Sequence, residues 1–204
     1  MNKGLFIESG NLLNATKALV MLHGRGGSAE DILSLAQYLP VKDYAMYAPQ
    51  ATGNSWYPQS FLAPPAANEP WLSSALEQIT EMVNEIEKRG IPAKDIYLLG
   101  FSQGACLTLE YVSRNAKRYG GVAAFTGGLI GDRVYRERYD GNFEQTPIFI
   151  GTADPDHHVP VERVYETEAI CKELMADITV KVYPGIGHTI VQDELLKASQ
   201  LIFS

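Results

Sequence analysis

The sequence is poor in cysteine and in positive charge, and it has no long apolar run. Its two cysteines, Cys106 and Cys171, each lie within an apolar helical pattern. We therefore expect small buried side chains rather than a disulfide framework or a zinc site. No stretch approaches the roughly 18 apolar residues that span a membrane, and the first ten residues lack the apolar core of a signal peptide. These absences predict a cytoplasmic protein with no membrane span.

The charge balance is acidic, because 17 Lys and Arg face 24 Asp and Glu and give a formal net charge of -7. Nucleic-acid affinity rests on clustered cations, so no nucleic-acid partner is expected. Hydrophobic residues make up 46% of the chain and charged residues 20%, which is typical of a globular domain and excludes a disordered chain or a fibre. A length of 204 residues predicts one domain spanning residues 1–204.

Short apolar runs alternate with helical periodicities along the chain. The expected strands are 18–22, 44–48, 96–99, 121–125, 147–150 and 178–183. The expected helices are 28–39, 72–86, 105–111, 161–175 and 194–203. Apolar strands alternating with helices predict an α/β fold, a mainly parallel sheet with helices on both faces. Segments 51–71 and 129–146 fit neither pattern, and we expect them to be long loops that wall a site.

The segment Gly100 to Gly104, with the sequence Gly-Phe-Ser-Gln-Gly, joins an expected strand to an expected helix. In that context G-x-S-x-G is typical of a nucleophile elbow, in which the serine has a strained backbone and the glycines let strand and helix approach. The turn places Ser102 at a helix N-terminus, where the backbone N–H of Gln103 points at developing negative charge. The alternative is a serine helix cap with incidental glycines.

A serine hydroxyl is a poor nucleophile until an imidazole accepts its proton, so the motif requires a histidine partner. His188 follows the last expected strand on a glycine loop and is the predicted base. His23 opens a glycine-rich loop, 23–27, in which the backbone N–H of Arg25 offers a second oxyanion donor. We expect the His23 ring itself to form local hydrogen bonds.

The third member of such a triad is a carboxylate between the serine and the histidine in sequence. Asp154 and Asp156 both follow an expected strand, and their spacing does not decide which one orients the imidazole. The rival use of this segment, with His157 and His158, is metal binding. Adjacent histidines usually diverge and no H-x-x-x-H spacing occurs, so no metal site is expected.

Taken together, these blocks resemble the phospholipase/carboxylesterase family, which includes the acyl-protein thioesterases, within the α/β-hydrolase superfamily. The similarity covers nearly the whole chain and rests on 22–26, 100–104, 151–160 and 187–188. It implies an α/β-hydrolase fold and no cofactor. Segments 51–71 and 129–146 are each too short for a full cap domain, so no large cap domain and an open, shallow site are expected. The resemblance also implies a catalytic set in which Ser102 is the nucleophile, His188 the base and Asp156 the acid, with an oxyanion hole formed by the backbone N–H groups of Arg25 and Gln103.

The resemblance implies a serine hydrolase that cleaves carboxylic esters, or thioesters, of small to medium acyl groups through an acyl-enzyme. The expected partner is a small-molecule ester substrate, and family analogy extends to a homodimer. Trp56, Tyr57 and Phe61 are the candidate substrate-pocket residues. The same residues leave two other interpretations open, a non-catalytic ligand-binding protein with this fold and an amide or peptide hydrolase.

Overall fold

A mostly parallel sheet forms the centre of the computed structural model, which describes residues 5–204. Within that range the strands are ordered β1-β3-β2-β4-β5-β6-β7. Their bounds are β1 Phe6–Gly10, β2 Ala18–Leu22, β3 Ala45–Pro49, β4 Ile96–Phe101, β5 Gly121–Phe125, β6 Pro147–Asp154 and β7 Asp177–Pro184. Neighbouring strands run parallel, except that β1 pairs antiparallel with β3 at one edge.

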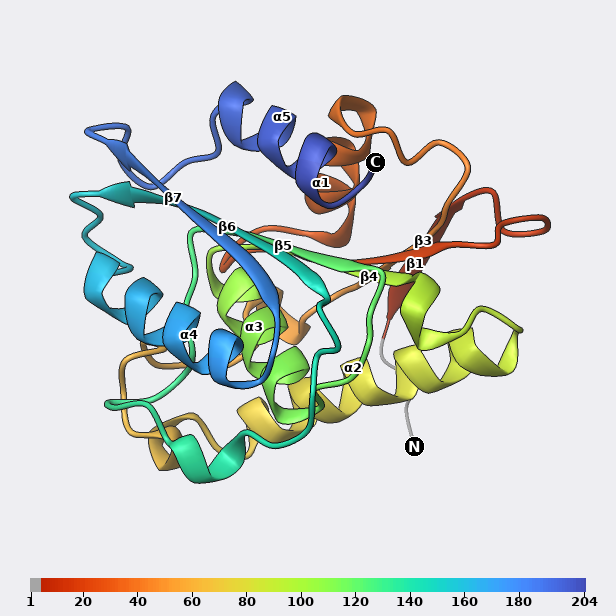
Figure 1. Cartoon of the computed structure of the whole chain (residues 1–204). Helices are drawn as coiled ribbons and strands as arrows, with labels where there is room; N and C mark the ends of the chain where they lie inside the picture. Colours follow the sequence, from red (N-terminus) through yellow and green to blue (C-terminus); the bar gives the residue numbers. More distant parts are fainter. Residues whose placement is uncertain (1–4) are drawn as a thin grey trace.

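Helices cover both faces of the sheet. Their bounds are α1 Ala29–Leu33, α2 Trp71–Lys88, α3 Gln103–Arg114, α4 Val161–Glu173 and α5 Gln192–Leu201. Figure 1 shows α1 and α5 on one face and α2, α3 and α4 on the other. Short 3-10 helices within residues 5–204 are η1 Ser34–Tyr38, η2 Thr52–Asn54, η3 Pro65–Asn68, η4 Ala93–Asp95 and η5 Arg136–Arg138. No helix in this range is long and apolar enough to cross a membrane.

The core lies in two layers, one on each face of the sheet. In β2 the side chains of Leu19 and Met21 join the cluster under α1 and α5, while Val20 and Leu22 join the cluster on the opposite face. Successive side chains of a strand point to opposite faces, so a strand buried on both sides must be apolar throughout, as β2 is. The α/β fold expected from the alternating pattern is confirmed, and no large cap domain is present among the described residues.

Two elements differ from the sequence prediction. The edge strand β1 was not expected, because its residues alternate between exposed and half-buried and form no apolar run. The helix expected over 28–39 begins with the capping box of Ser28 and Asp31 but ends at Leu33 and continues as η1. The Ser34 hydroxyl donates to the carbonyl oxygen of Asp31, a local hydrogen bond that bends or ends helices.

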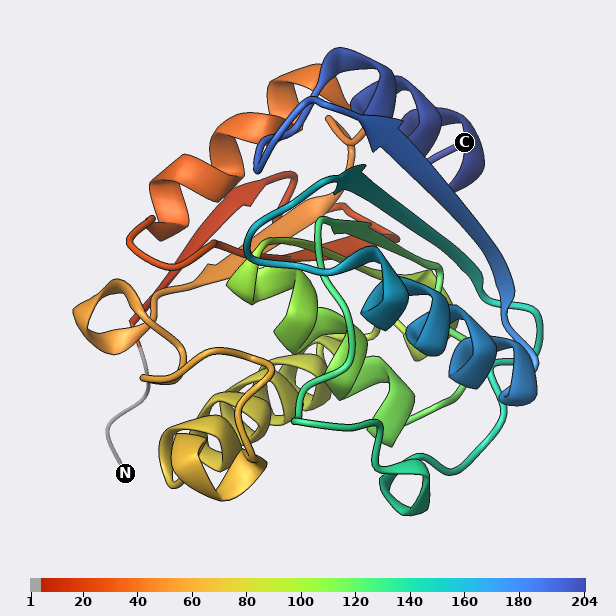
Figure 2. The ribbon, with the colours of Figure 1, turned by 90° about the vertical axis from the view of Figure 1, so that its left-hand side faces the viewer.

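The candidate site lies at one edge of the sheet. In parallel strands the carboxyl ends meet at the same edge, where ligands of open α/β sheets bind. The chain leaves β2 at Leu22, β4 at Phe101, β6 at Asp154 and β7 at Pro184, and each loop that follows carries one of the expected site residues. Figure 2 views the molecule from this side.

Candidate active site

Ser102 has the backbone geometry of a nucleophile elbow. Its φ of 54° and ψ of -119° lie in a region that costs a non-glycine residue roughly 1–3 kcal/mol. The surrounding glycines make the turn possible, since a Cβ at Gly100 would overlap the carbonyl of Gly104, and a Cβ at Gly104 would overlap the carbonyl of Leu22. The strand–turn–helix arrangement expected from the motif is therefore present, and the serine does not act as an ordinary helix cap.

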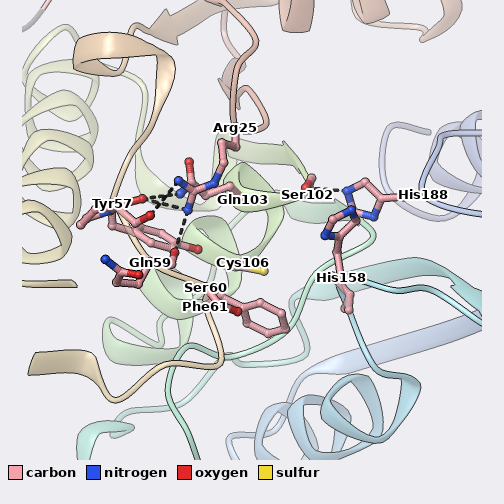
Figure 3. Close-up of a pocket in the computed structure, with 12 residues that line it drawn as sticks. Arg25, Tyr57, Gln59, Ser60, Phe61, Ser102, Gln103, Cys106, His158 and His188 are labelled. Carbon is pink, nitrogen blue, oxygen red and sulfur yellow. Dashed lines mark hydrogen bonds between the residues drawn. The ribbon is translucent and has the colours of Figure 1, made fainter. Parts of the chain in front are cut away.

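Hydrogen bonds connect Ser102, His188 and Asp156 in one chain. The Oγ of Ser102 lies 2.7 Å from Nε2 of His188, a contact drawn in Figure 3, and Nδ1 of the same ring lies 2.8 Å from Oδ2 of Asp156. The Asp156 side chain is fully buried, whereas the His188 side chain is 24% exposed. The fold thus brings together three side chains that lie 86 and 32 positions apart in the sequence.

The surroundings of Asp156 favour an ionised carboxylate. Its Oδ1 accepts the backbone N–H groups of His158 at 2.7 Å and of Val159 at 3.0 Å. Burial alone would raise the pKa of Asp156, but these amides and the His188 ring outweigh it and hold the pKa below its usual value. Asp154 is exposed, and its backbone carbonyl accepts the N–H of Gly185 at 3.1 Å. Of the two aspartates whose spacing left the choice open, Asp156 is the one that contacts the imidazole.

Two backbone amides beside Ser102 are free to bind an anion. Neither the N–H of Arg25 nor that of Gln103 has a hydrogen-bond acceptor among residues 5–204. Gln103 is the first residue of α3, so its N–H also lies at the positive end of the helix dipole. The structure therefore leaves both predicted oxyanion donors available at the start of the site.

His23 has a structural position rather than a catalytic one. Its Nδ1 lies 2.8 Å from the carbonyl oxygen of Gly24, and its Nε2 accepts the backbone N–H of Ala51 at 3.1 Å. Since Ala51 can only donate there, Nε2 is unprotonated and the ring is neutral. Burial lowers the pKa of His23, although the Gly24 carbonyl acts in the opposite direction. The ring fixes the loop that carries Arg25.

An open pocket of about 390 Å³ lies between Ser102 and the segment 57–61 (Figure 3). It is lined by Arg25, Tyr57, Pro58, Gln59, Ser60, Phe61, Ser102, Gln103, Cys106, His158, Val159 and His188. Two of the three predicted pocket residues, Tyr57 and Phe61, are in that set.

Trp56 is the exception, and the prediction that it lines the pocket is wrong. Its side chain is buried, its indole N–H donates to the carbonyl oxygen of His23 at 2.8 Å, and its ring packs on the His23 imidazole with 4.9 Å between centroids. The indole therefore lies behind the residues that line the pocket. Tyr135, from the second long loop, is also absent from the lining.

Cys106 is a pocket residue that sequence reasoning missed. Cys106 lies four positions after Ser102 on α3, so the helical spacing could have placed it beneath the serine. Burial raises the pKa of the Cys106 thiol to about 12, which keeps the thiol protonated and unreactive. His158 packs edge to face on His188 with 4.8 Å between ring centroids, and only the folded loop shows this contact. Residues 5–204 contain no cluster of three His, Cys, Asp or Glu side chains able to hold a metal.

Known proteins with similar sequences include carboxylesterases and acyl-protein thioesterases. The pattern of the phospholipase/carboxylesterase family matches residues 2–203. The chain is 27% identical to acyl-protein thioesterase 1 of Saccharomyces cerevisiae over 89% of each protein. A match to a rice (Oryza sativa) protein named a probable carboxylesterase has 33% identity over 136 residues, and it covers 62% of this chain and about half, 51%, of the rice protein.

One solved structure is more similar to this chain than these relatives are. A crystal structure of a phospholipase/carboxylesterase from Dyadobacter fermentans is 54% identical, with a TM-score of 0.97, covering 98% of this chain and 97% of that one. SOBER1 of Arabidopsis thaliana is 21% identical, with a TM-score of 0.77, covering 92% of this chain and 97% of that one. The second likeness supports the fold alone.

Proposed function

This chain belongs to the phospholipase/carboxylesterase family, a family of hydrolases, and we propose that it cleaves carboxylic esters or thioesters of small to medium acyl groups with Ser102, His188 and Asp156. The proposal rests above all on the hydrogen-bond chain from Ser102 Oγ through His188 to Asp156. That chain begins at a strained elbow serine and is bordered by two amides that have no acceptor within the described part of the chain, residues 5–204. The whole arrangement faces an open pocket.

The hydrogen bonds assign each proton before the reaction. The ionised Asp156 can only accept, so Nδ1 of His188 carries the proton of that contact and Nε2 is free to accept the Ser102 hydroxyl proton. In the first step Ser102 Oγ forms a bond to the ester carbonyl carbon while its proton moves to Nε2. Asp156 then stabilises the resulting imidazolium without itself taking the proton.

The carbonyl oxygen becomes an oxyanion in the tetrahedral intermediate. We assign its stabilisation to the backbone N–H groups of Arg25 and Gln103, which have no other acceptor among residues 5–204. Loss of one such donor typically lowers the rate by about 10²–10³-fold. When the intermediate collapses, the bond to the leaving oxygen or sulfur breaks, and His188 gives its proton to the departing alcohol or thiol.

Water completes the cycle. His188 accepts a proton from a water molecule as the water oxygen attacks the acyl carbon of the Ser102 ester. The second tetrahedral intermediate collapses, the carboxylic acid leaves, and the proton on Nε2 returns to Ser102. Every proton in both steps passes through one nitrogen, which lies 2.7 Å from Ser102 Oγ.

The variant Ser102→Ala tests the proposal. It removes the nucleophile and leaves the packing of the elbow unchanged, so kcat for p-nitrophenyl butyrate should fall by at least about 10⁴-fold. Thermal unfolding should be nearly unchanged, which distinguishes lost chemistry from lost structure. Undiminished turnover by a folded Ser102→Ala protein would contradict the proposed role.

Two assays separate the alternatives. A non-catalytic ligand-binding protein would bind an ester and release it unchanged, whereas the proposed enzyme releases alcohol and acid. An amide or peptide hydrolase would cleave a matched acyl amide at a rate comparable to the ester. We expect the ester to react much faster, because the amine leaving group requires more assistance from His188.

A further inference from the structure

The pocket wall formed by residues 55–61 is irregular chain, yet the backbone carbonyls of residues 57–61 all accept hydrogen bonds. The segment has no helix or strand, and a loop of this kind must find partners for its N–H and C=O groups elsewhere. Here the partners are mainly side chains of three residues, Arg25, Gln103 and Asn68. What holds the wall is therefore a small set of identifiable contacts.

Arg25 donates more of these hydrogen bonds than Gln103 or Asn68 does. Its Nη1 donates to the Ser55 hydroxyl and to the Pro58 carbonyl, each at 3.0 Å. Its Nη2 donates to the carbonyls of Tyr57 at 3.0 Å and Gln59 at 2.7 Å (Figure 3). The two terminal nitrogens of a guanidinium carry four N–H groups, so all four are used. The side chain therefore has no terminal donor left for an anionic substrate.

Gln103 holds the wall from the side of α3. Its amide oxygen accepts the backbone N–H of Trp56 at 2.9 Å, and its amide nitrogen donates to the carbonyl of Tyr57 at 2.8 Å. Arg25 and Gln103 are also the two residues whose backbone N–H groups we assign to the oxyanion hole. The same residues thus border the reacting carbonyl with their backbones and fix the adjacent wall with their side chains.

Other residues hold the wall at its second end, residues 59–61. The buried Asn68 side chain accepts the N–H of Gln59 at 2.8 Å and donates to the carbonyl of Ser60 at 3.0 Å. The carbonyl of Phe61 accepts the N–H of Gly131 at 2.7 Å. Residues 55–58 therefore depend chiefly on Arg25 and Gln103, Gln59 is held by both Arg25 and Asn68, and residues 60–61 are held independently of Arg25.

The wall lies on the side of Ser102 where the acyl group must extend. His188 protonates the leaving group, so the alcohol or thiol lies toward the imidazole. The acyl group then points away from it, and Figure 3 shows residues 57–61 and His188 on opposite sides of Ser102. The wall that Arg25 holds is therefore the wall that an acyl chain meets.

We propose that Arg25 is a specificity-determining residue, whose guanidinium holds segment 55–59 against the acyl side of the pocket and so favours compact acyl groups over long ones. This inference rests on the proposed esterase function. It does not require the guanidinium to touch the substrate, because its effect is transmitted through the carbonyls of 57–59.

The test compares Arg25→Met with Arg118→Met. Methionine keeps most of the length of the side chain and removes the charge and all donors. Arg118 is the matched control, since its guanidinium likewise donates to two loop carbonyls, those of Glu144 and Gln145, outside the pocket lining. The readout is the ratio of kcat/KM for p-nitrophenyl octanoate to that for p-nitrophenyl butyrate, which is independent of the fraction of active enzyme.

In Arg25→Met the ratio should rise by about tenfold or more, the scale on which pocket shape discriminates acyl size, while Arg118→Met keeps the wild-type ratio. An unchanged ratio in Arg25→Met, or an equal change in both variants, would overturn the proposal.

Should Arg25→Met fail to fold, the variant Arg25→Lys provides the test. An ammonium group cannot reproduce the four hydrogen bonds of the guanidinium, so the ratio should rise, though by less than in Arg25→Met. An unchanged ratio in Arg25→Lys would then overturn the proposal. Failure of the proposed function itself would differ, since Ser102→Ala would then hydrolyse both esters at the wild-type rate.

Discussion

Ser102 and His188 are supported in different ways, although only 2.7 Å separates their reacting atoms. Ser102 lies in a turn where a Cβ at Gly100 or Gly104 would overlap backbone. His188 lies on a loop where a Cβ at Gly185 or Gly187 would meet nothing within 4 Å. The contrast indicates that packing holds the proposed nucleophile in its strained conformation, whereas the base depends on a few polar contacts.

Carboxylates supply two of those contacts. Asp156 binds the imidazole of His188, and Oε2 of Glu194 accepts the N–H of Val191 at 2.8 Å, where the loop enters α5. The comparison therefore predicts that changes at the elbow glycines act on folding, whereas changes at the two carboxylates act on chemistry or on the pH dependence of stability.

The largest effect is expected from Asp156→Asn. The amide can donate to Nδ1 of His188 and favour the wrong tautomer, so kcat should fall by about 10⁴-fold with little change in stability. The matched control is Asp154→Asn, an exposed residue at the end of the same strand, which should keep wild-type kcat. Steady-state hydrolysis of p-nitrophenyl butyrate measures both. Comparable losses in the two variants would remove the distinction between these carboxylates.

At the elbow, Gly104→Ala tests whether packing holds Ser102. The new methyl group would overlap the Leu22 carbonyl, so the free energy of unfolding should fall by about 3 kcal/mol or more. Gly187→Ala is the counterpart on the His188 loop, where space is open but φ is 71°, and should lose only about 1 kcal/mol. Urea unfolding measures both, and equal losses would break the comparison.

The smallest effect concerns Glu194 and appears as a dependence on pH. Burial raises the pKa of this carboxyl from 4.5 to about 7, although the Val191 amide acts against the shift. Between about pH 4.5 and 7 the folded protein keeps a proton on Glu194 that the unfolded chain releases, so the contribution of this carboxyl to stability falls as pH rises through that window, while the lowered pKa of His23 acts in the opposite direction. Glu194→Gln should remove this slope and gain up to about 3 kcal/mol at pH 8.

The exposed Glu162 provides the control for that measurement, since Glu162→Gln should leave the pH profile of stability unchanged. Unfolding is best followed above pH 5, because the lowered pKa of Asp156 has the opposite effect in more acidic solution. If Glu194→Gln keeps the wild-type slope between pH 5 and 7, the carboxyl is not buried as a neutral group.

Local patterns sufficed for the elbow and for the parallel sheet, because both are set by residues close in sequence. Gly100 to Gly104 encodes strand, turn and helix together, and apolar runs such as 121–125 predict strand bounds that the structure reproduces. The edge strand β1 was not predicted, since it has one pairing partner and one exposed face and therefore no apolar run. The hydrophobic pattern of a sequence therefore identifies a strand that is buried on both faces better than a strand at the edge of the sheet.

Contacts between distant segments could not be read from the sequence. Asp154 and Asp156 leave the same strand two residues apart, and only the position of the β7 loop shows which of them meets His188. Trp56 looked like a pocket residue because it stands among other aromatics, but its indole N–H is paired with His23. The four contacts of Arg25 reach 30 to 34 positions along the chain, beyond any local signal.

The central claim is that an activated Ser102 acts as the nucleophile, and covalent labelling tests it most directly. A fluorophosphonate should react rapidly with the wild-type protein and add one phosphonyl group, and peptide mass spectrometry should locate that group on Ser102. Ser102→Ala and His188→Ala should both stay unlabelled over the same time, because the hydroxyl is reactive only beside the imidazole. An adduct on another residue, or labelling that persists in His188→Ala at the wild-type rate, would contradict the account.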